Sequence, residues 1–245
     1  MTLERLILIM QRLRDPQHGC EWDRAQSFAS IAPYTIEEAY EVADAIARND
    51  MDSLADELGD LALQVIFHTQ IAAEAGHFTL DDVLSRICDK LERRHPHIFG
   101  GSATSPGWET LKAQERSAAD DQSALAGVAL ALPALERAVK LQRRAARTGF
   151  DWPDETGPLG KIHEELAELA EATTATQRQE ELGDLLFAVV NLARHLNIEP
   201  ETALREANRK FERRFRAIEQ TPSFETLALS DKEALWQRAK LAQSD

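Results

Sequence analysis

Two short acidic motifs in the second half of the chain bring together carboxylates that could act on one ligand. Glu164, Glu165 and Glu168 are separated by one, three and four positions, so one broad face of a helix carries all three. Glu181 and Asp184 are three residues apart on the next predicted helix. Because the connection between the two helices is short, we expect antiparallel packing, with the two groups of carboxylates facing one another.

Such a cluster predicts a site for a divalent metal ion. Carboxylates within a few ångströms repel one another unless a cation neutralises them. Oxygen-only ligands favour a hard ion, Mg²⁺ or Mn²⁺, over zinc. Gly183 lies inside the second motif, and a helix-interior glycine costs about 1 kcal/mol relative to alanine. We therefore also expect a close backbone approach at this glycine.

The same motifs occur earlier in the chain, in the same order. The acidic positions of the first copy are Glu37, Glu38, Glu41, Glu57 and Asp60, with Gly59 beside the last of them. The basic segment 90–94 recurs as 210–214, and the tryptophan segment 21–23 recurs as 151–153. Trp108 followed by Lys112 parallels Trp236 followed by Lys240. An isolated acidic motif is usually a solvated helix face, but its ordered repetition favours a metal site.

The chain is thus two copies of a module of roughly 110–120 residues, near the size of a small domain. We expect modules at 1–116 and 129–245. The segment 117–128 between them is rich in Ala, Ser and Asp and has no apolar stripe, so it is predicted to be a linker.

Apolar residues recur at helical spacing throughout, and no segment alternates with period two over a strand's length. The expected helices cover 3–13, 37–47, 52–73, 79–91, 132–147, 158–172, 178–195 and 200–219. A last helix is expected to open at Ser230, with Glu233 completing a capping box. Pro96 should end the fourth helix and leave 95–97 as a loop. Few glycines (11) and prolines (9) fit this all-α fold of two helical-bundle modules.

Composition narrows the class of protein. Acidic residues outnumber basic ones 42 to 28, for a net charge of −14, which disfavours a nucleic-acid polymer or an anionic membrane as partner. Two cysteines exclude a disulfide scaffold and favour the cytoplasm. We expect neither a signal peptide nor a membrane span. No P-loop and no Gly-x-Ser-x-Gly motif occurs.

The basic segment of the second copy has two interpretations. Lys210, Arg213 and Arg214 could clamp a phosphate opposite the metal, or form a surface helix paired with nearby Glu206 and Glu212. Trp236 could likewise stack on a base or serve only in packing.

The pairing of Glu-Glu-x-x-Glu with Glu-x-x-Asp on tandem all-α modules resembles the MazG family of nucleoside triphosphate pyrophosphohydrolases. The resemblance covers nearly the whole chain and includes the segments 181–188, 191–194 and 210–215. It implies hydrolysis of a nucleoside triphosphate to the monophosphate and pyrophosphate with Mg²⁺, for which Mn²⁺ could substitute. It also implies a house-cleaning role in the nucleotide pool and a homodimer, which fits modules too thin to bury a site alone.

The resemblance assigns site residues to the second copy. The implied metal ligands are Glu165, Glu168, Glu181 and Asp184. The implied nucleotide contacts are Lys161, Glu164, Glu180, Asp184, Lys210, Arg213, Arg214 and Trp236. Glu164 or Glu180 would orient or deprotonate the attacking water, and the sequence leaves both open. The sequence departs from the family at Gln177, where members can carry a lysine.

We expect the second copy to be the catalytic one, because Pro96 interrupts the basic helix of the first. A second site in the first copy, at its five acidic positions, stays an alternative. A di-metal oxidase is a rival, although such bundles use Glu-x-x-His and this chain has Asp184 at that place. The other rival is a helical scaffold that binds nucleotides without catalysis.

Overall fold

The computed structural model describes residues 2–100, 121 and 123–242, and these residues form helices, turns and loops without a β-strand. The predicted all-α class is therefore confirmed. The chain divides into two compact units, Met1–Gln114 and Glu115–Asp245. The module limits expected at 116 and 129 stay a prediction. No helix within the described ranges is both long enough and apolar enough to span a bilayer.

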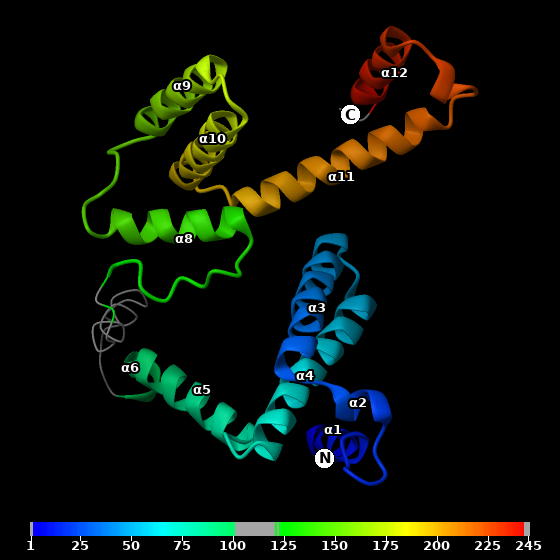
Figure 1. The fold of residues 1–245 in the computed structure, drawn as a ribbon, viewed down its shortest axis with the longest axis vertical. Helices are drawn as coiled ribbons and strands as arrows, with labels where there is room; N and C mark the ends of the chain where they lie inside the picture. The colour runs from blue at the N-terminus through cyan, green and yellow to red at the C-terminus, as the bar shows by residue number, and fades with distance from the viewer. Residues whose placement is uncertain (1, 101–120, 122, 243–245) are drawn as a thin grey trace. The chain divides into compact units, whose positions relative to one another are not determined.

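The first unit is built around a helical hairpin (Figure 1). Its elements are α1 (Thr2–Leu13), α2 (Glu21–Ala25), α3 (Phe28–Arg48), α4 (Met51–Glu74), α5 (Leu80–Arg94) and α6 (Pro96–Phe99). Helices α3 and α4 pack along one another, and α1 lies against α4. The buried core consists of Met10, Ile31, Ile66, Phe67 and Ile71.

A two-residue turn makes this hairpin antiparallel. Asn49 ends α3 in the left-handed region (φ 54°), which an asparagine tolerates better than most residues. Asp50 then caps α4, because its carboxylate accepts a hydrogen bond from the Ser53 backbone N–H at 3.1 Å. The short turn is what brings the acidic face of α3 opposite that of α4.

The second unit repeats the hairpin and adds a longer arm. Its elements are α8 (Ala134–Ala146), α9 (Thr156–Glu171), α10 (Ala175–His195), α11 (Pro200–Glu219), the 3-10 helix η1 (Phe224–Thr226) and α12 (Leu229–Leu241). Helices α9 and α10 form the hairpin, and α8 packs against α10. Helix α11 leads away from the hairpin, with α12 folded back along it (Figure 1).

Several helix limits differ from those predicted. Helix α2 was not predicted, and α3 begins at Phe28 rather than 37 because Ser27 and Ser30 form a capping box there. Helix α10 begins at Ala175 for the same reason, with Thr174 and Gln177 as the box. Capping side chains thus set helix starts that apolar periodicity alone missed.

Two further expectations were wrong. The segment 95–97 is not a loop, since Pro96 and His97 open α6; the fixed φ of proline suits the first position of a helix. The capping box at Ser230 is absent as well, because α12 begins at Leu229 and its N-cap is Ala228, which has no capping side chain. The predicted tryptophan motif at Trp108 and Lys112 lies outside the described residues, as do positions 117–120 and 122 of the predicted linker.

A part-buried ion pair connects the segment after α1 to the C-terminal end of α4 in the first unit. The guanidinium of Arg14, just after α1, donates to both carboxylate oxygens of Glu74 at the end of α4, at 2.9 and 2.7 Å. It also donates to the backbone carbonyls of Asp23 and Gln26. Only 7% of the Arg14 side chain is exposed. The hydrogen bonds from Arg14 lower the pKa of Glu74 below its ordinary value of 4.5, against the opposing effect of burial.

We predict that Glu74→Gln destabilises the first unit by about 1–3 kcal/mol at neutral pH, because it leaves a buried guanidinium without its counter-charge. A carboxyl group with a lowered pKa stabilises the folded state above its unfolded pKa and loses that effect as the pH falls through the folded pKa. Denaturant unfolding followed from pH 7 to pH 3 should therefore show the variant and the wild type converging below pH 4.5.

The control is Arg48→Gln, whose ion pairs with Asp44 and Asp50 are exposed and should contribute about 0.5 kcal/mol or less. An effect of Glu74→Gln no larger than that of Arg48→Gln would contradict the structural role given to the Arg14–Glu74 pair.

Candidate metal centre and adjoining pocket

Three of the four predicted metal ligands gather between α9 and α10. Glu165 and Glu168 of α9 and Glu181 of α10 each offer a carboxylate oxygen, and these oxygens all lie within 4.8 Å of one another. Glu165 is only 2% exposed, and its Oε2 atom has no hydrogen-bond partner among the described residues. A buried carboxylate oxygen without a donor costs free energy, so this all-oxygen cluster fits a hard divalent cation.

The fourth predicted ligand, Asp184, lies one helical turn after Glu181 on α10 and outside this group of three. Its negative charge nevertheless affects the ionisation of Glu181. The pKa of Glu181 is raised above 4.5, first by burial and then by the negative charges of Glu168, Glu165 and Asp184. The cluster therefore concentrates negative charge that a cation would offset.

One lysine already offsets part of this charge. The ammonium of Lys161, one turn before Glu165 on α9, lies 2.8 Å from a carboxylate oxygen of Glu164 and 2.6 Å from one of Glu165. These two hydrogen bonds raise the pKa of Lys161, so the side chain stays charged. Glu180, the other candidate for activating water, is exposed on α10 next to Glu181.

The first unit contains the equivalent cluster. Oxygens of Glu38, Glu41 and Glu57 lie within 4.8 Å of one another. The pKa of Glu38 is raised, first by burial and then by Asp60 and Glu41. Glu37 is exposed. The acidic geometry is thus present in both copies, and other features must distinguish them.

A pocket of about 720 Å³ adjoins the cluster of the second unit. Its lining includes three residues from the metal end and a set of aromatic and amide side chains that the motif analysis did not select. The metal end consists of Lys161, Glu165 and Asp184, and the other part includes Gln142, Phe150, Trp152, Phe187 and Asn191. Three of these residues lie in segments that the sequence analysis had noted: Trp152 in the repeated segment 151–153, and Phe187 and Asn191 in the family-like segments 181–188 and 191–194.

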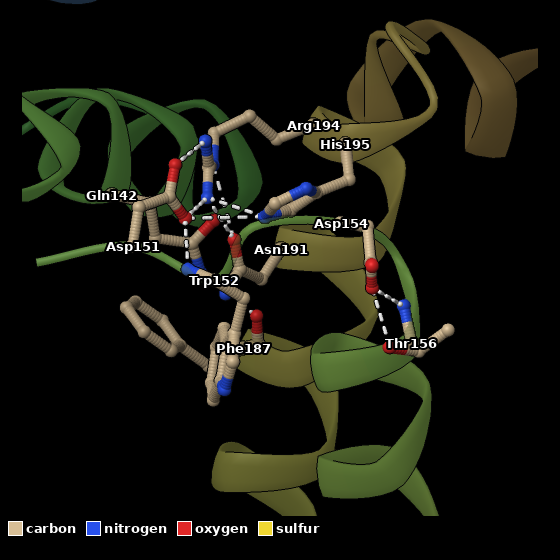
Figure 2. Close-up of polar contacts among 9 residues, drawn as sticks. All are labelled: Gln142, Asp151, Trp152, Asp154, Thr156, Phe187, Asn191, Arg194 and His195. Carbon is tan, nitrogen blue, oxygen red and sulfur yellow. Dashed lines mark hydrogen bonds and ion pairs between the residues drawn. The ribbon is translucent and has the colours of Figure 1, made fainter.

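An ionic network fixes the loop that closes this pocket. Figure 2 shows the guanidinium of Arg194 directed at the carboxylate of Asp151, with contacts to both of its oxygens, one of them at 2.8 Å. His195 Nε2 lies 3.1 Å from Asp151 as well, and Arg194 Nε donates to Asn191 Oδ1 at 3.0 Å. These hydrogen bonds, Arg194 first, lower the pKa of Asp151. The loop carrying Trp152 is thereby held on α10.

The predicted phosphate clamp does not line the pocket of its own chain. Lys210, Arg213 and Arg214 lie on α11, and none of them is among the lining residues. Trp236 on α12 packs against Phe211, with ring centroids 5.2 Å apart. The basic helix therefore contributes none of these residues to the pocket beside the carboxylate cluster.

The expected close approach at Gly183 is also not made within the described chain. A Cβ atom added at Gly183, or at Gly59 in the first unit, would have no neighbour within 4 Å. The residues flanking Gly183 are apolar and exposed: Leu182 is 48% and Leu186 51% exposed. This face of α10 is left uncovered by its own unit.

Comparisons with known proteins agree with the repeated motifs. The family described as the MazG nucleotide pyrophosphohydrolase domain matches residues 26–99 and 158–218. A protein named nucleoside triphosphate pyrophosphohydrolase from Escherichia coli (strain K12) is 49% identical, over 99% of this chain and 98% of that protein. The nucleoside triphosphate pyrophosphohydrolase/pyrophosphatase MazG of Thermotoga maritima is 46% identical, over 98% and 96%. Both motif copies and nearly the full length are shared, and the chain therefore belongs to the MazG family.

Proposed function

We propose that the chain hydrolyses nucleoside triphosphates to nucleoside monophosphates and pyrophosphate with the help of Mg²⁺, which Mn²⁺ can replace. The observation that carries this proposal is the Glu165–Glu168–Glu181 cluster, whose buried Glu165 oxygen lacks a hydrogen-bond donor. Family membership and the names of the two relatives supply the reaction class. The two free cysteines fit a reducing compartment such as the cytoplasm, where the enzyme would clean the nucleotide pool.

Different residues around the cluster would bind the metal ion, bind the substrate and activate water. Glu165, Glu168, Glu181 and Asp184 would hold the ion, which would neutralise phosphate oxygens and activate water. Lys161 lies close enough to the cluster to bind a phosphate oxygen once the metal relieves Glu165 of its ion pair. Glu164 or Glu180 would then orient or deprotonate the water. Further contacts to the nucleotide would come from Lys210, Arg213, Arg214 and Trp236.

We assign catalysis to the second unit alone. Aligning Glu38 with Glu165 places Tyr34 where the second unit has Lys161, so the first cluster has no cation at that position. The basic helix α5 contains Lys90, Arg93 and Arg94, but it ends at Arg94, whereas α11 continues past Arg214 to Glu219. The first unit thus keeps the acidic cluster and the basic residues of α5, but it lacks a cation at the position of Lys161 and the continuation of the basic helix.

We also propose that two chains form a homodimer through the uncovered face of the α9–α10 hairpin. Leu166 on α9 is 48% exposed, and Leu182 and Leu186 on α10 are exposed to a similar degree. Contiguous exposed apolar side chains of this size mark interaction surfaces. The open space at Gly183 would admit a close backbone approach from a second copy. A symmetric pair would complete a four-helix arrangement around the carboxylates.

The first test removes the metal. We expect pyrophosphate release from nucleoside triphosphates to need Mg²⁺ or Mn²⁺ and to stop with excess chelator. Mn²⁺ should also raise the melting temperature of the protein, since it binds the folded site only. Hydrolysis that persists unchanged in chelator would rule out the proposed site.

The second test separates the two units. Glu165→Gln should lower kcat by about a hundredfold or more, because a neutral amide disturbs ligation at the most buried position of the cluster. Its matched control is Glu38→Gln, the same change at the equivalent position of the first unit, which should retain most of the activity. Equal losses in steady-state pyrophosphate release would mean that both units are catalytic.

The third test concerns assembly. Light scattering should give twice the 27.4 kDa of one chain. Leu182→Glu, which puts a charge on the uncovered face of α10, should shift the population toward monomers. The control Leu130→Glu alters a side chain that is 83% exposed and lies before α8, and it should leave the dimer intact. A wild-type monomer at micromolar concentration would overturn the dimer proposal.

A further inference from the structure

The pocket beside the metal cluster is chemically unlike the rest of the site. At one end lie Lys161, Glu165 and Asp184, and toward the other end the lining turns to aromatic rings, apolar groups and side-chain amides. The two charged residues at the loop end, Asp151 and Arg194, neutralise one another in an ion pair. A pocket of about 720 Å³ with few, convergent polar groups is typical of a site for a small organic ligand.

One buried amide in this lining has an unused acceptor. Gln142 on α8 is only 6% exposed, and its Nε2 donates to the backbone carbonyl of Phe187 at 2.9 Å. Its Oε1 atom is buried without a hydrogen-bond partner among the described residues. A buried unpaired acceptor is costly. A ligand that donates an N–H in the pocket would remove that cost.

The first unit has apolar core residues at two positions that line this pocket in the second unit. The segment 3–5 recurs as 135–137, so Met10 occupies the position of Gln142. The segment 57–61 recurs as 181–185, so Phe67 occupies the position of Asn191. Met10 and Phe67 belong to the buried apolar core of the first unit, with 1% and 4% of their surface exposed. Two core positions that are apolar in one copy therefore carry amides in the other.

The tryptophan of the repeated loop follows the same difference. In the first unit Trp22 packs edge-on against Phe67, with ring centroids 6.5 Å apart. In the second unit its counterpart Trp152 lines the pocket together with Asn191. A Cβ atom at Gly157 would overlap the Trp152 side chain. The start of α9 thus accepts the indole only because residue 157 is glycine, and the ring has a defined place in the pocket wall.

We propose that this pocket binds the nucleobase of the substrate. Gln142 would accept a hydrogen bond from the edge of the base, Asn191 would supply a second amide, and Trp152 would pack against the face of the base. Asp151 and Arg194 act as positioning residues, because they hold the Trp152 loop on α10. The inference rests on the proposed function, since the phosphates of the same nucleotide are taken to lie at the carboxylate cluster.

A nucleobase fits the part of the pocket that is lined by aromatic rings and side-chain amides, next to the carboxylates. A nucleobase is planar and uncharged and carries both donors and acceptors on its edge. Aromatic side chains stack on any base, and amides hydrogen-bond to its edge. The first unit carries the buried apolar side chains Met10 and Phe67 at these two positions, so it lacks the amides that would hydrogen-bond to a base. This agrees with catalysis in the second unit alone.

Two of the test variants place the first unit's residues at the equivalent positions of the second unit. Gln142→Met and Asn191→Phe fill the pocket, and Trp152→Ala removes the exposed indole. In each variant kcat/KM for nucleoside triphosphates should fall about tenfold or more, equivalent to ~1.4 kcal/mol, mainly through KM. The wild type should also hydrolyse ribose 5-triphosphate, which lacks a base, at least about tenfold less efficiently than a nucleoside triphosphate.

Two controls make the result specific. Gln17→Met applies the same chemical change to an exposed residue of the first unit and should leave kcat/KM at the wild-type value. Mn²⁺ binding, followed by calorimetry, should be retained in the pocket variants, which shows that the α9–α10 hairpin is folded. If Asn191→Phe loses Mn²⁺ binding, Gln142→Met and Trp152→Ala decide the question.

Failure of the base pocket and failure of the proposed function would give different results. An active wild type whose Gln142→Met and Trp152→Ala variants keep their KM for every nucleotide would overturn the base pocket and leave the proposed function standing. Equal efficiency toward ribose 5-triphosphate and nucleoside triphosphates would do the same. A wild type that releases no pyrophosphate from any nucleoside triphosphate would refute the proposed function and, with it, the pocket assignment.

Discussion

Mutual repulsion among carboxylates held between two antiparallel helices is the constraint on which the second unit depends. Glu165 is buried, and the pKa of Glu181 is raised, first by burial and then by the negative charges of its neighbours. Such an arrangement persists because the hairpin forces α9 and α10 together and because Lys161 offsets part of the charge. In the proposed function, the crowding that disfavours the cluster alone is offset by a divalent cation.

The two units surround the same helical hairpin with different side chains. Both have a hairpin with three carboxylates in reach of one another. The difference lies around the hairpin, where the first unit has Met10, Phe67 and Tyr34 at the positions of Gln142, Asn191 and Lys161. Apolar packing stabilises the first unit at Met10 and Phe67. The second unit gives up that packing for polar groups and an open pocket, which is the usual compromise between stability and a binding site.

The loops before the hairpins are held by ionic contacts in both units, but the residues involved do not correspond. Arg14 follows α1 and reaches Glu74 at the end of α4, whereas Arg194 lies near the end of α10 and reaches back to Asp151 in the loop. In each case one guanidinium connects the segment before the hairpin to the hairpin's second helix. Planar, bidentate pairing suits this task, because it fixes orientation as well as distance.

The sequence by itself determined the helical class, the repetition and the members of the acidic clusters, because helical spacing and motif order depend only on positions along the chain. It placed Glu165, Glu168 and Glu181 on facing helices, and the structure brings them together. Helix starts were less accurate where a capping side chain decided them, as at Ser27 and Thr174. The pocket could not be predicted in this way. Gln142, Trp152 and Asn191 come from α8, a loop and α10, and only the packing of α8 on α10 and the Asp151–Arg194 ion pair bring them to one cavity. Local spacing fixes which residues share a helix face, whereas long-range packing decides which faces meet and what space is left between them.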